Sequence, residues 1–168
     1  MRKAMPTRKI AIMGLYTALS LAVYAAESAL PPLAPIPGFK LGLANIITLI
    51  LLKRYTFKDA ALVLTARILL SALLFGQAIS LLYSLVGGAF SLIVMSLTSR
   101  LLSKRFLPLT GAMGGLSHNA GQLAAAFFFT ATPYVLSYLP FLLPAGILTG
   151  LFTGLCAQFA DRLLSRHT

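Results

Sequence analysis

The sequence is poor in acidic residues, cysteine and tryptophan. Its 168 residues include three acids, one cysteine and no tryptophan, and charged residues make up 10% of the chain. A soluble domain carries about a quarter charged residues, so this chain has too few to cover a surface that faces water. No two of the acids Glu27, Asp59 and Asp161 lie within thirty residues of each other, which excludes a local carboxylate cluster. Cys156 alone forms neither an intramolecular disulfide nor a cysteine-rich zinc site.

Apolar residues dominate instead: they make up 58% of the chain, and the mean hydropathy is +0.89. This content excludes disorder. A helix needs about 20 apolar residues to cross a bilayer, and six such helices would use roughly 120 residues. The apolar runs are too long, and too rich in Leu and Ala, for the roughly 10-residue strands of an outer-membrane barrel. We therefore expect an all-α integral membrane protein.

Six apolar segments predict six transmembrane helices in a single domain covering residues 1–168. The first segment is longer than the apolar part of a signal peptide, so we expect a helix that is retained. Four prolines between residues 31 and 37 end it, and Pro140 and Pro144 predict a kink in the last segment. The expected spans are residues 10–30, 41–52, 59–75, 78–99, 111–131 and 134–160.

The basic residues predict the orientation of these spans. The N-terminus, the loops 53–58 and 100–105, and the C-terminal tail hold 4, 3, 3 and 2 of them, all on one side, whereas the other side holds Lys40. The positive-inside rule places both termini in the cytoplasm, and we expect the multi-pass cytoplasmic membrane of a prokaryote. Basic residues that flank apolar runs contact membrane lipid and do not indicate nucleic-acid binding.

Polar side chains inside a span are costly and indicate a functional or packing site facing the bundle interior. Arg67 lies eight residues after Asp59, roughly 12 Å into the membrane. Two interpretations stay open: an anchor for an anionic ligand group, or an arginine satisfied by Glu27 or by carbonyl groups. In the fifth span, His118 and Gln122 share a face at a similar depth. They form either a common cavity with Arg67 or an interhelical hydrogen-bond network.

We interpret six polar residues as one ligand site that opens outward under the proline-rich segment 31–38. Two of them lie near the outer end of the second span, where a Lys40–Glu27 ion pair is the simpler alternative. The excess of cationic groups predicts a ligand with a carboxylate or phosphate. The candidate ligand-binding residues are Lys40, Asn45, Arg67, His118, Asn119 and Gln122.

Catalytic, metal and cofactor sites are not expected. Acid–base catalysis lacks the carboxylates it needs, and a histidine without a second ligand nearby does not form a metal site. The chain has no GxSxG motif and no phosphate-binding loop of the GxxxxGK[ST] type. Active transport would therefore need a separate ATP-hydrolysing subunit.

Two spans carry stripes of small residues at every fourth position, a pattern that lets another helix approach closely. Internal packing and docking of a partner protein both explain such a stripe, and the first span is the better docking candidate because it adjoins the cytoplasmic tail. The stripes are Gly14, Ala18, Ala22 and Ala26 in the first span, and Gly146, Gly150 and Gly154 in the sixth.

Four features, residues 37–46 (PGFKLGLANI), Arg67, residues 84–88 (SLVGG) and residues 118–122 (HNAGQ), together resemble the Gx transporter family, also called heptaprenyl diphosphate synthase component I. The resemblance covers essentially the whole chain. The family is similar to the substrate-binding S components of energy-coupling factor (ECF) vitamin transporters, six-helix membrane proteins with both termini inside and a ligand pocket near the outer face.

The resemblance implies a subunit that binds a small, vitamin-like or isoprenoid-precursor-like anion for uptake. In S components the small-residue stripe of the first helix docks onto a transmembrane subunit driven by two ATPases, and the stripe from Gly14 to Ala26 matches that position. The alternative is a non-catalytic accessory subunit of heptaprenyl diphosphate or quinone synthesis. Prenyl transfer needs Asp-rich motifs that hold magnesium and diphosphate, which this chain lacks, so we do not expect an enzyme.

Overall fold

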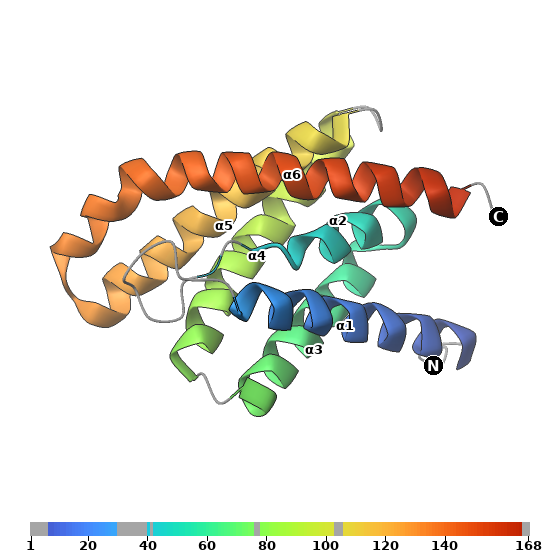
Figure 1. Ribbon diagram of the computed structural model, residues 1–168, viewed down its shortest axis with the longest axis horizontal. Coiled ribbons are helices and arrows are strands. Elements are labelled where there is room, and N and C mark those ends of the chain that lie inside the picture. The colour runs from blue at the N-terminus through green and yellow to red at the C-terminus, as the bar shows by residue number, and fades with distance from the viewer. Residues whose placement is uncertain (1–6, 30–39, 41, 76–77, 103–105, 166–168) are drawn as a thin grey trace.

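The computed structural model describes residues 7–29, 40, 42–75, 78–102 and 106–165, without the side chains of 78–80, and the structural statements below concern these residues. They form helices and no strand, which confirms the all-helical expectation for this part of the chain. A 3₁₀ helix, Pro133–Tyr138, precedes the last α-helix (Figure 1). The α-helices are α1 (Thr7–Ser28), α2 (Asn45–Arg54), α3 (Phe57–Phe75), α4 (Ala78–Leu101), α5 (Leu107–Thr130) and α6 (Leu139–Ser165).

Each expected span overlaps one of these helices, but several ends differ. Helix α2 begins at Asn45 rather than at residue 41, because Gly42 has a φ of 79°, which no α-helix accommodates. Helix α5 begins at Leu107, earlier than expected, since a proline at the start of a helix loses no hydrogen bond. The last span is divided into the 3₁₀ helix and α6, which contains Pro144. The proline-rich segment 31–38 lies outside the described residues.

Three helical stretches are long and apolar enough to cross a membrane: α1, residues Leu81–Leu101 of α4, and the continuous stretch Pro133–Ser165 that contains α6. The chain therefore has helices of the membrane-protein type. The other three helices are short or polar. Helix α2 has ten residues, α3 carries three charged residues, and α5 carries one histidine and two amides. Six membrane crossings remain a prediction.

Helices α5 and α6 approach each other at their glycines. A Cβ atom added at Gly115 would lie 2.9 Å from the Cα of Gly150, and one added at Gly111 would lie 2.8 Å from the Cα of Gly154. Real Cβ atoms do not come this close to a backbone, so larger residues would push the two helices apart. Internal packing therefore explains the small-residue stripe of the sixth expected span.

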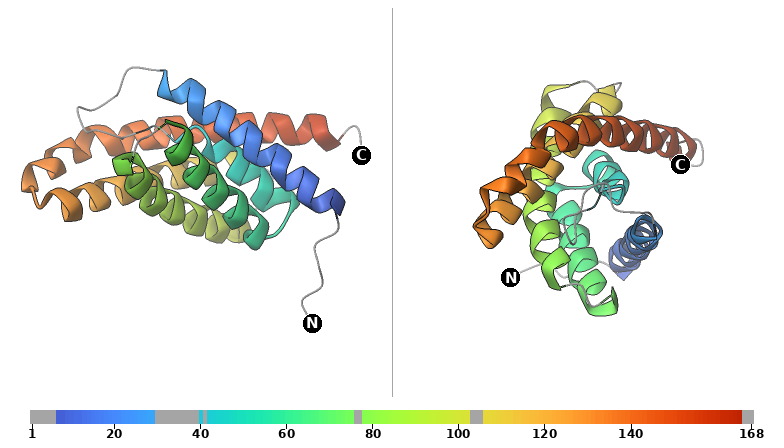
Figure 2. Two further views of the ribbon diagram at one scale, coloured as in Figure 1. Left: turned by 90° about the horizontal axis from the view of Figure 1, so that it is seen from below. Right: turned by 60° about the vertical axis from the view of Figure 1, so that its left-hand side comes forward.

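Helix α1 lies at the edge of the bundle, where it packs against α3 and α2 (Figure 2). Its buried face includes Tyr24 and Glu27. Its small-residue stripe faces outward, and a Cβ atom at Gly14 would meet nothing within 4 Å. Packing within the described part of the chain therefore does not explain this stripe. The exposed stripe residues are Gly14, Ala18, Ala22 and Ala26.

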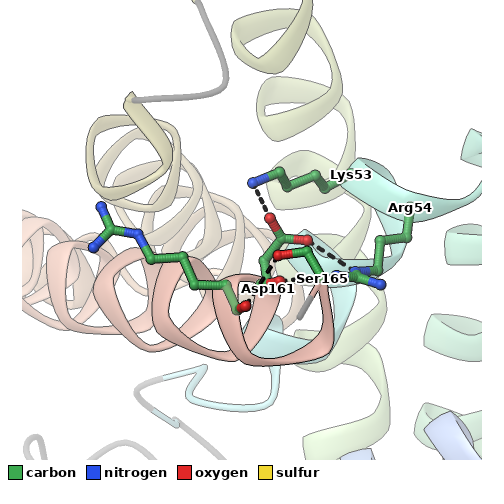
Figure 3. Close-up of polar contacts among 5 residues, drawn as sticks. Lys53, Arg54, Asp161 and Ser165 are labelled. Atoms are coloured by element: carbon green, nitrogen blue, oxygen red, sulfur yellow. Dashed lines mark hydrogen bonds and ion pairs between the residues drawn. The ribbon is translucent and has the colours of Figure 1, made fainter. Parts of the chain in front are cut away.

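The ion pairs of the described residues lie at one end of the bundle, where α1 begins and α6 ends (Figure 1). Lys9 pairs with Asp59 at 2.8 Å and joins α1 to α3. Asp161 of α6 forms ion pairs with Lys53 and Arg54, the last two residues of α2 (Figure 3). We call this part of the molecule the basic end; it is the side that the positive-inside pattern predicts to be cytoplasmic.

Candidate functional site

A group of buried polar side chains lies on the three helices that are short or polar. Asn45 of α2, Arg67 of α3, and His118 and Gln122 of α5 are each at most 4% exposed. We call these four residues the polar cluster. Arginine and amide side chains are rarely buried to this degree unless they are paired, so the cluster needs an explanation in terms of its partners.

Two glycines allow the members of the cluster to approach each other. A Cβ atom at Gly42 would lie 2.8 Å from Cδ2 of His118 and 3.0 Å from Nδ2 of Asn45. A Cβ atom at Gly87 of α4 would lie 2.7 Å from Cγ of Gln122 and 3.2 Å from Nδ1 of His118. His118 therefore stands between the two glycines, with Asn45 and Gln122 on either side of it. Arg67 is close enough to interact with His118 electrostatically.

Glu27, in the last turn of α1, binds the backbone that leads into α2. Its Oε1 accepts a hydrogen bond from the N–H of Gly42 at 2.7 Å, and its Oε2 accepts one from Leu43 at 3.0 Å. The carboxylate also interacts electrostatically with Arg67 and Lys40. Sequence reasoning considered Glu27 only as a partner of these cations. Its hydrogen bonds to Gly42 and Leu43 join residues 15 and 16 positions apart, and local sequence does not predict contacts over such separations.

Lys40 contacts Tyr24 and Ser28, and forms no direct ion pair with Glu27 among the described residues. Its ammonium group lies 3.5 Å from the centre of the Tyr24 ring and donates a hydrogen bond to the Ser28 hydroxyl. The guanidinium carbon of Arg67 lies 5.9 Å from the same ring. Cations are attracted to aromatic faces over such distances. Tyr24 therefore connects Lys40 to the polar cluster. The sequence does not predict this role, because Tyr24 lies in an apolar helix.

Seven buried polar atoms have no hydrogen-bond partner among the described residues, and all belong to the predicted ligand-binding residues. They are Oδ1 of Asn45, Nε and Nη2 of Arg67, Nδ1 of His118, Oδ1 of Asn119, and Nε2 and Oε1 of Gln122. An unpaired buried polar group costs about 1–3 kcal/mol, and folded proteins satisfy roughly nine in ten or more. This concentration indicates a site whose hydrogen-bond partners come from beyond the described residues.

Asn119 lies away from the rest of the predicted site. Its Nδ2 donates a hydrogen bond to the carbonyl of Leu142 in α6 at 2.7 Å. One helical position turns a side chain by about 100°, so Asn119 faces α6 while His118 faces α4. The structure brings together the other five predicted residues, which are Lys40, Asn45, Arg67, His118 and Gln122.

A separate cavity of about 120 Å³ lies at the basic end, between α2, α4 and α5. Most of its lining is leucine, and its Lys53 is paired with Asp161. None of the seven unpartnered atoms belongs to its lining. In the described ranges no three His, Cys, Asp or Glu residues are placed to hold a metal ion. The polar cluster is therefore the stronger candidate site.

The helices and the polar cluster define a class: a helical protein of the membrane type with a buried site of cationic and amide groups. The family model for heptaprenyl diphosphate synthase component I matches residues 16–160, and the chain belongs to this family. The match includes Glu27, both glycines and the whole polar cluster. Comparisons with curated proteins and with solved structures found no match.

Proposed function

We propose that this chain is the substrate-binding membrane subunit of an uptake transporter for a small anion, of the ECF S-component type. The concentration of unpartnered polar atoms in the polar cluster supports this proposal most directly. Arg67 supplies a buried cation, and its Nε and Nη2 atoms, which have no partner in the described part of the chain, lie on one edge of the guanidinium group. That edge matches the two oxygens of a carboxylate or phosphate.

The position of the site along the bundle fits uptake from outside. Glu27 lies eighteen residues after Lys9 on α1, about 27 Å farther from the basic end at 1.5 Å per residue. Arg67 lies about 12 Å along α3 from Asp59. With the basic end in the cytoplasm, the ligand would reach the cluster from the outer side. The termini would both be cytoplasmic, in a prokaryotic cell membrane.

Replacement of Arg67 tests the proposed function. Wild-type protein in detergent is incubated with a metabolite extract of the host cells, washed and denatured, and the released compounds are measured by mass spectrometry. We expect Arg67→Ala to lower the retained compound at least tenfold, because the buried charge partner is lost. Arg162→Ala, at an exposed arginine of the basic end, serves as the control. Equal retention by Arg67→Ala and wild type would contradict the proposal.

The outward-facing stripe of α1 provides a surface for the transmembrane subunit that such a transporter requires. Small residues let a second helix approach closely, and the stripe has no partner within the described part of the chain. We expect Ala18→Leu to abolish co-purification with an energy-coupling transmembrane subunit and its ATPases, with retention of the small molecule unchanged. Normal assembly of the Ala18→Leu variant would show that the stripe does not dock a partner.

The family description favours a second function, that of a non-catalytic accessory subunit of heptaprenyl diphosphate synthesis. The acids of this chain are already engaged: Glu27 binds backbone amides, Asp59 pairs with Lys9, and Asp161 pairs with two cations. We infer that catalysis would come from another subunit. Co-purification with a prenyl synthase favours the accessory role, whereas co-purification with transporter ATPases favours uptake.

A further inference from the structure

We propose that the bound anion carries a single negative group together with an amide-like edge, meaning an N–H donor next to a C=O acceptor, and that the site discriminates against diphosphates. This inference rests on the proposed function and specifies its ligand. It follows from which atoms of the polar cluster are free, how they are oriented, and how much charge surrounds them.

Gln122 carries the argument for the amide-like edge. Its side chain is 1% exposed, and both Nε2 and Oε1 lack a partner among the described residues. Whichever way the amide is turned, it therefore presents a donor and an acceptor side by side. A matching ligand edge offers an acceptor and a donor in return, as an amide, lactam or ureide does. A hydrocarbon group would leave both atoms unsatisfied.

Asn45 and His118 extend the same surface toward Gly42. The Nδ2 atom of Asn45 donates to the hydroxyl of Ser91 at 3.3 Å, which directs its free Oδ1 to accept a hydrogen bond. Nδ1 of His118 lies on the side of Gly87, next to Gln122. The ligand would therefore contact the polar groups of Asn45, His118 and Gln122 as well as the charge of Arg67.

The charge around the cluster favours a single negative group. Arg67 and Lys40 are cationic, and Glu27 is an acid that interacts with both. Glu27 is bound by the N–H groups of Gly42 and Leu43, so it remains in place when a ligand enters. With Glu27 as the carboxylate whose two oxygens Gly42 and Leu43 bind, the three side chains carry one net positive charge, which one anionic group balances. A diphosphate would bring at least two negative charges into a buried site, and an uncompensated buried charge is strongly unfavourable.

The test compares matched variants in the metabolite-extract experiment described above. Gln122→Met keeps the length of the side chain and removes both polar atoms, and Gln158→Met makes the same change on α6. We expect wild type to retain a nitrogen-containing compound with one acidic group and no diphosphate. Retention falls at least tenfold in Gln122→Met and in Arg67→Gln, and is unchanged in Gln158→Met. The unfolding temperature of each variant shows whether it folds. If Gln122→Met does not fold, Gln122→Asn, which keeps an amide, is compared with Gln122→Ala. Gln122→Asn should then retain more compound than Gln122→Ala.

Other outcomes separate the inference from the proposed function. If retention requires Arg67 but not Gln122, or if the compound lacks an amide nitrogen or carries a diphosphate, the inference is wrong and the uptake function stands. If no compound depends on Arg67, the uptake function itself is wrong. Isopentenyl diphosphate and inorganic pyrophosphate, added separately, should leave the unfolding temperature of wild type unchanged. A rise that Arg67→Gln abolishes would overturn the charge argument.

Discussion

Each of the three acids in this chain lies beside a cation or a backbone N–H group. Asp59 pairs with Lys9 and also accepts a hydrogen bond from the hydroxyl of Thr56 at 2.8 Å. Asp161 holds α2 against α6 at the basic end (Figure 3). Glu27 differs from these two acids in forming no direct ion pair among the described residues, because its direct partners are backbone amides at the edge of the polar cluster. It therefore positions Gly42 and, through Gly42, the neighbouring His118 and Asn45.

Replacing Glu27 tests this positioning role. Glu27→Ala removes two hydrogen bonds to a buried carboxylate, each worth about 1.5–3 kcal/mol, so we expect a lower unfolding temperature in detergent and weaker retention of the small molecule. Glu27→Gln keeps one acceptor and should lose less of both. The prediction fails if Glu27→Ala unfolds at the wild-type temperature.

Among the structural elements, two helices with the same small-residue pattern have opposite roles. The glycines of α6 touch the backbone of α5, whereas the stripe of α1 faces outward. Helix α1 lies at the edge of the bundle (Figure 2), so its outer face has no neighbour in the described part of the chain. The pattern alone indicates that a close approach is possible, but it does not say which helix approaches.

A pair of matched substitutions distinguishes the two stripes. A Cβ atom at Gly150 would lie 2.7 Å from the Cα of Ala112, so Gly150→Leu should separate α5 from α6. Overpacking costs typically 1–3 kcal/mol, and the backbone contact favours the upper part of this range. Gly14→Leu should not lower stability, because a Cβ there meets nothing within 4 Å and leucine favours a helix more than glycine does. Thermal unfolding of both purified variants provides the measurement, and equal unfolding temperatures would contradict the assigned packing.

At the scale of the whole molecule, charge and polarity divide the bundle into two ends. The basic end gathers the start of α1, the end of α2 and the end of α6 through ion pairs. The 3₁₀ helix lies at the opposite end (Figure 1). The polar cluster lies between them, on α2, α3 and α5, the helices that hold Asn45, Arg67, His118 and Gln122.

Cysteine labelling tests the predicted orientation. In a Cys156→Ser background, Ser165→Cys marks the basic end and Tyr134→Cys marks the opposite one. A membrane-impermeant maleimide should label Tyr134→Cys, but not Ser165→Cys, in intact cells, and the reverse in inside-out vesicles. Labelling of both positions from the same side would show that the positive-inside prediction is wrong.

Sequence reasoning found the helices and most of the candidate site, because both depend on properties that act along the chain. Long apolar runs predict helices, and a polar residue within such a run stands out wherever the helix packs. Arg67, His118 and Gln122 were identified in this way. Tyr24 was missed because nothing in its local sequence distinguishes a ring beside two cations from a ring that faces lipid.

The sequence by itself determined the helical class, the asymmetry of charge, and which side chains need polar partners. Only the tertiary structure decided that Glu27 binds the backbone of Gly42, that Asn119 bonds α6, and that one small-residue stripe is covered while the other is exposed. The reason is physical. Hydropathy and helical periodicity are local, whereas a hydrogen bond or a close backbone contact depends on which distant segments the fold brings within a few ångströms.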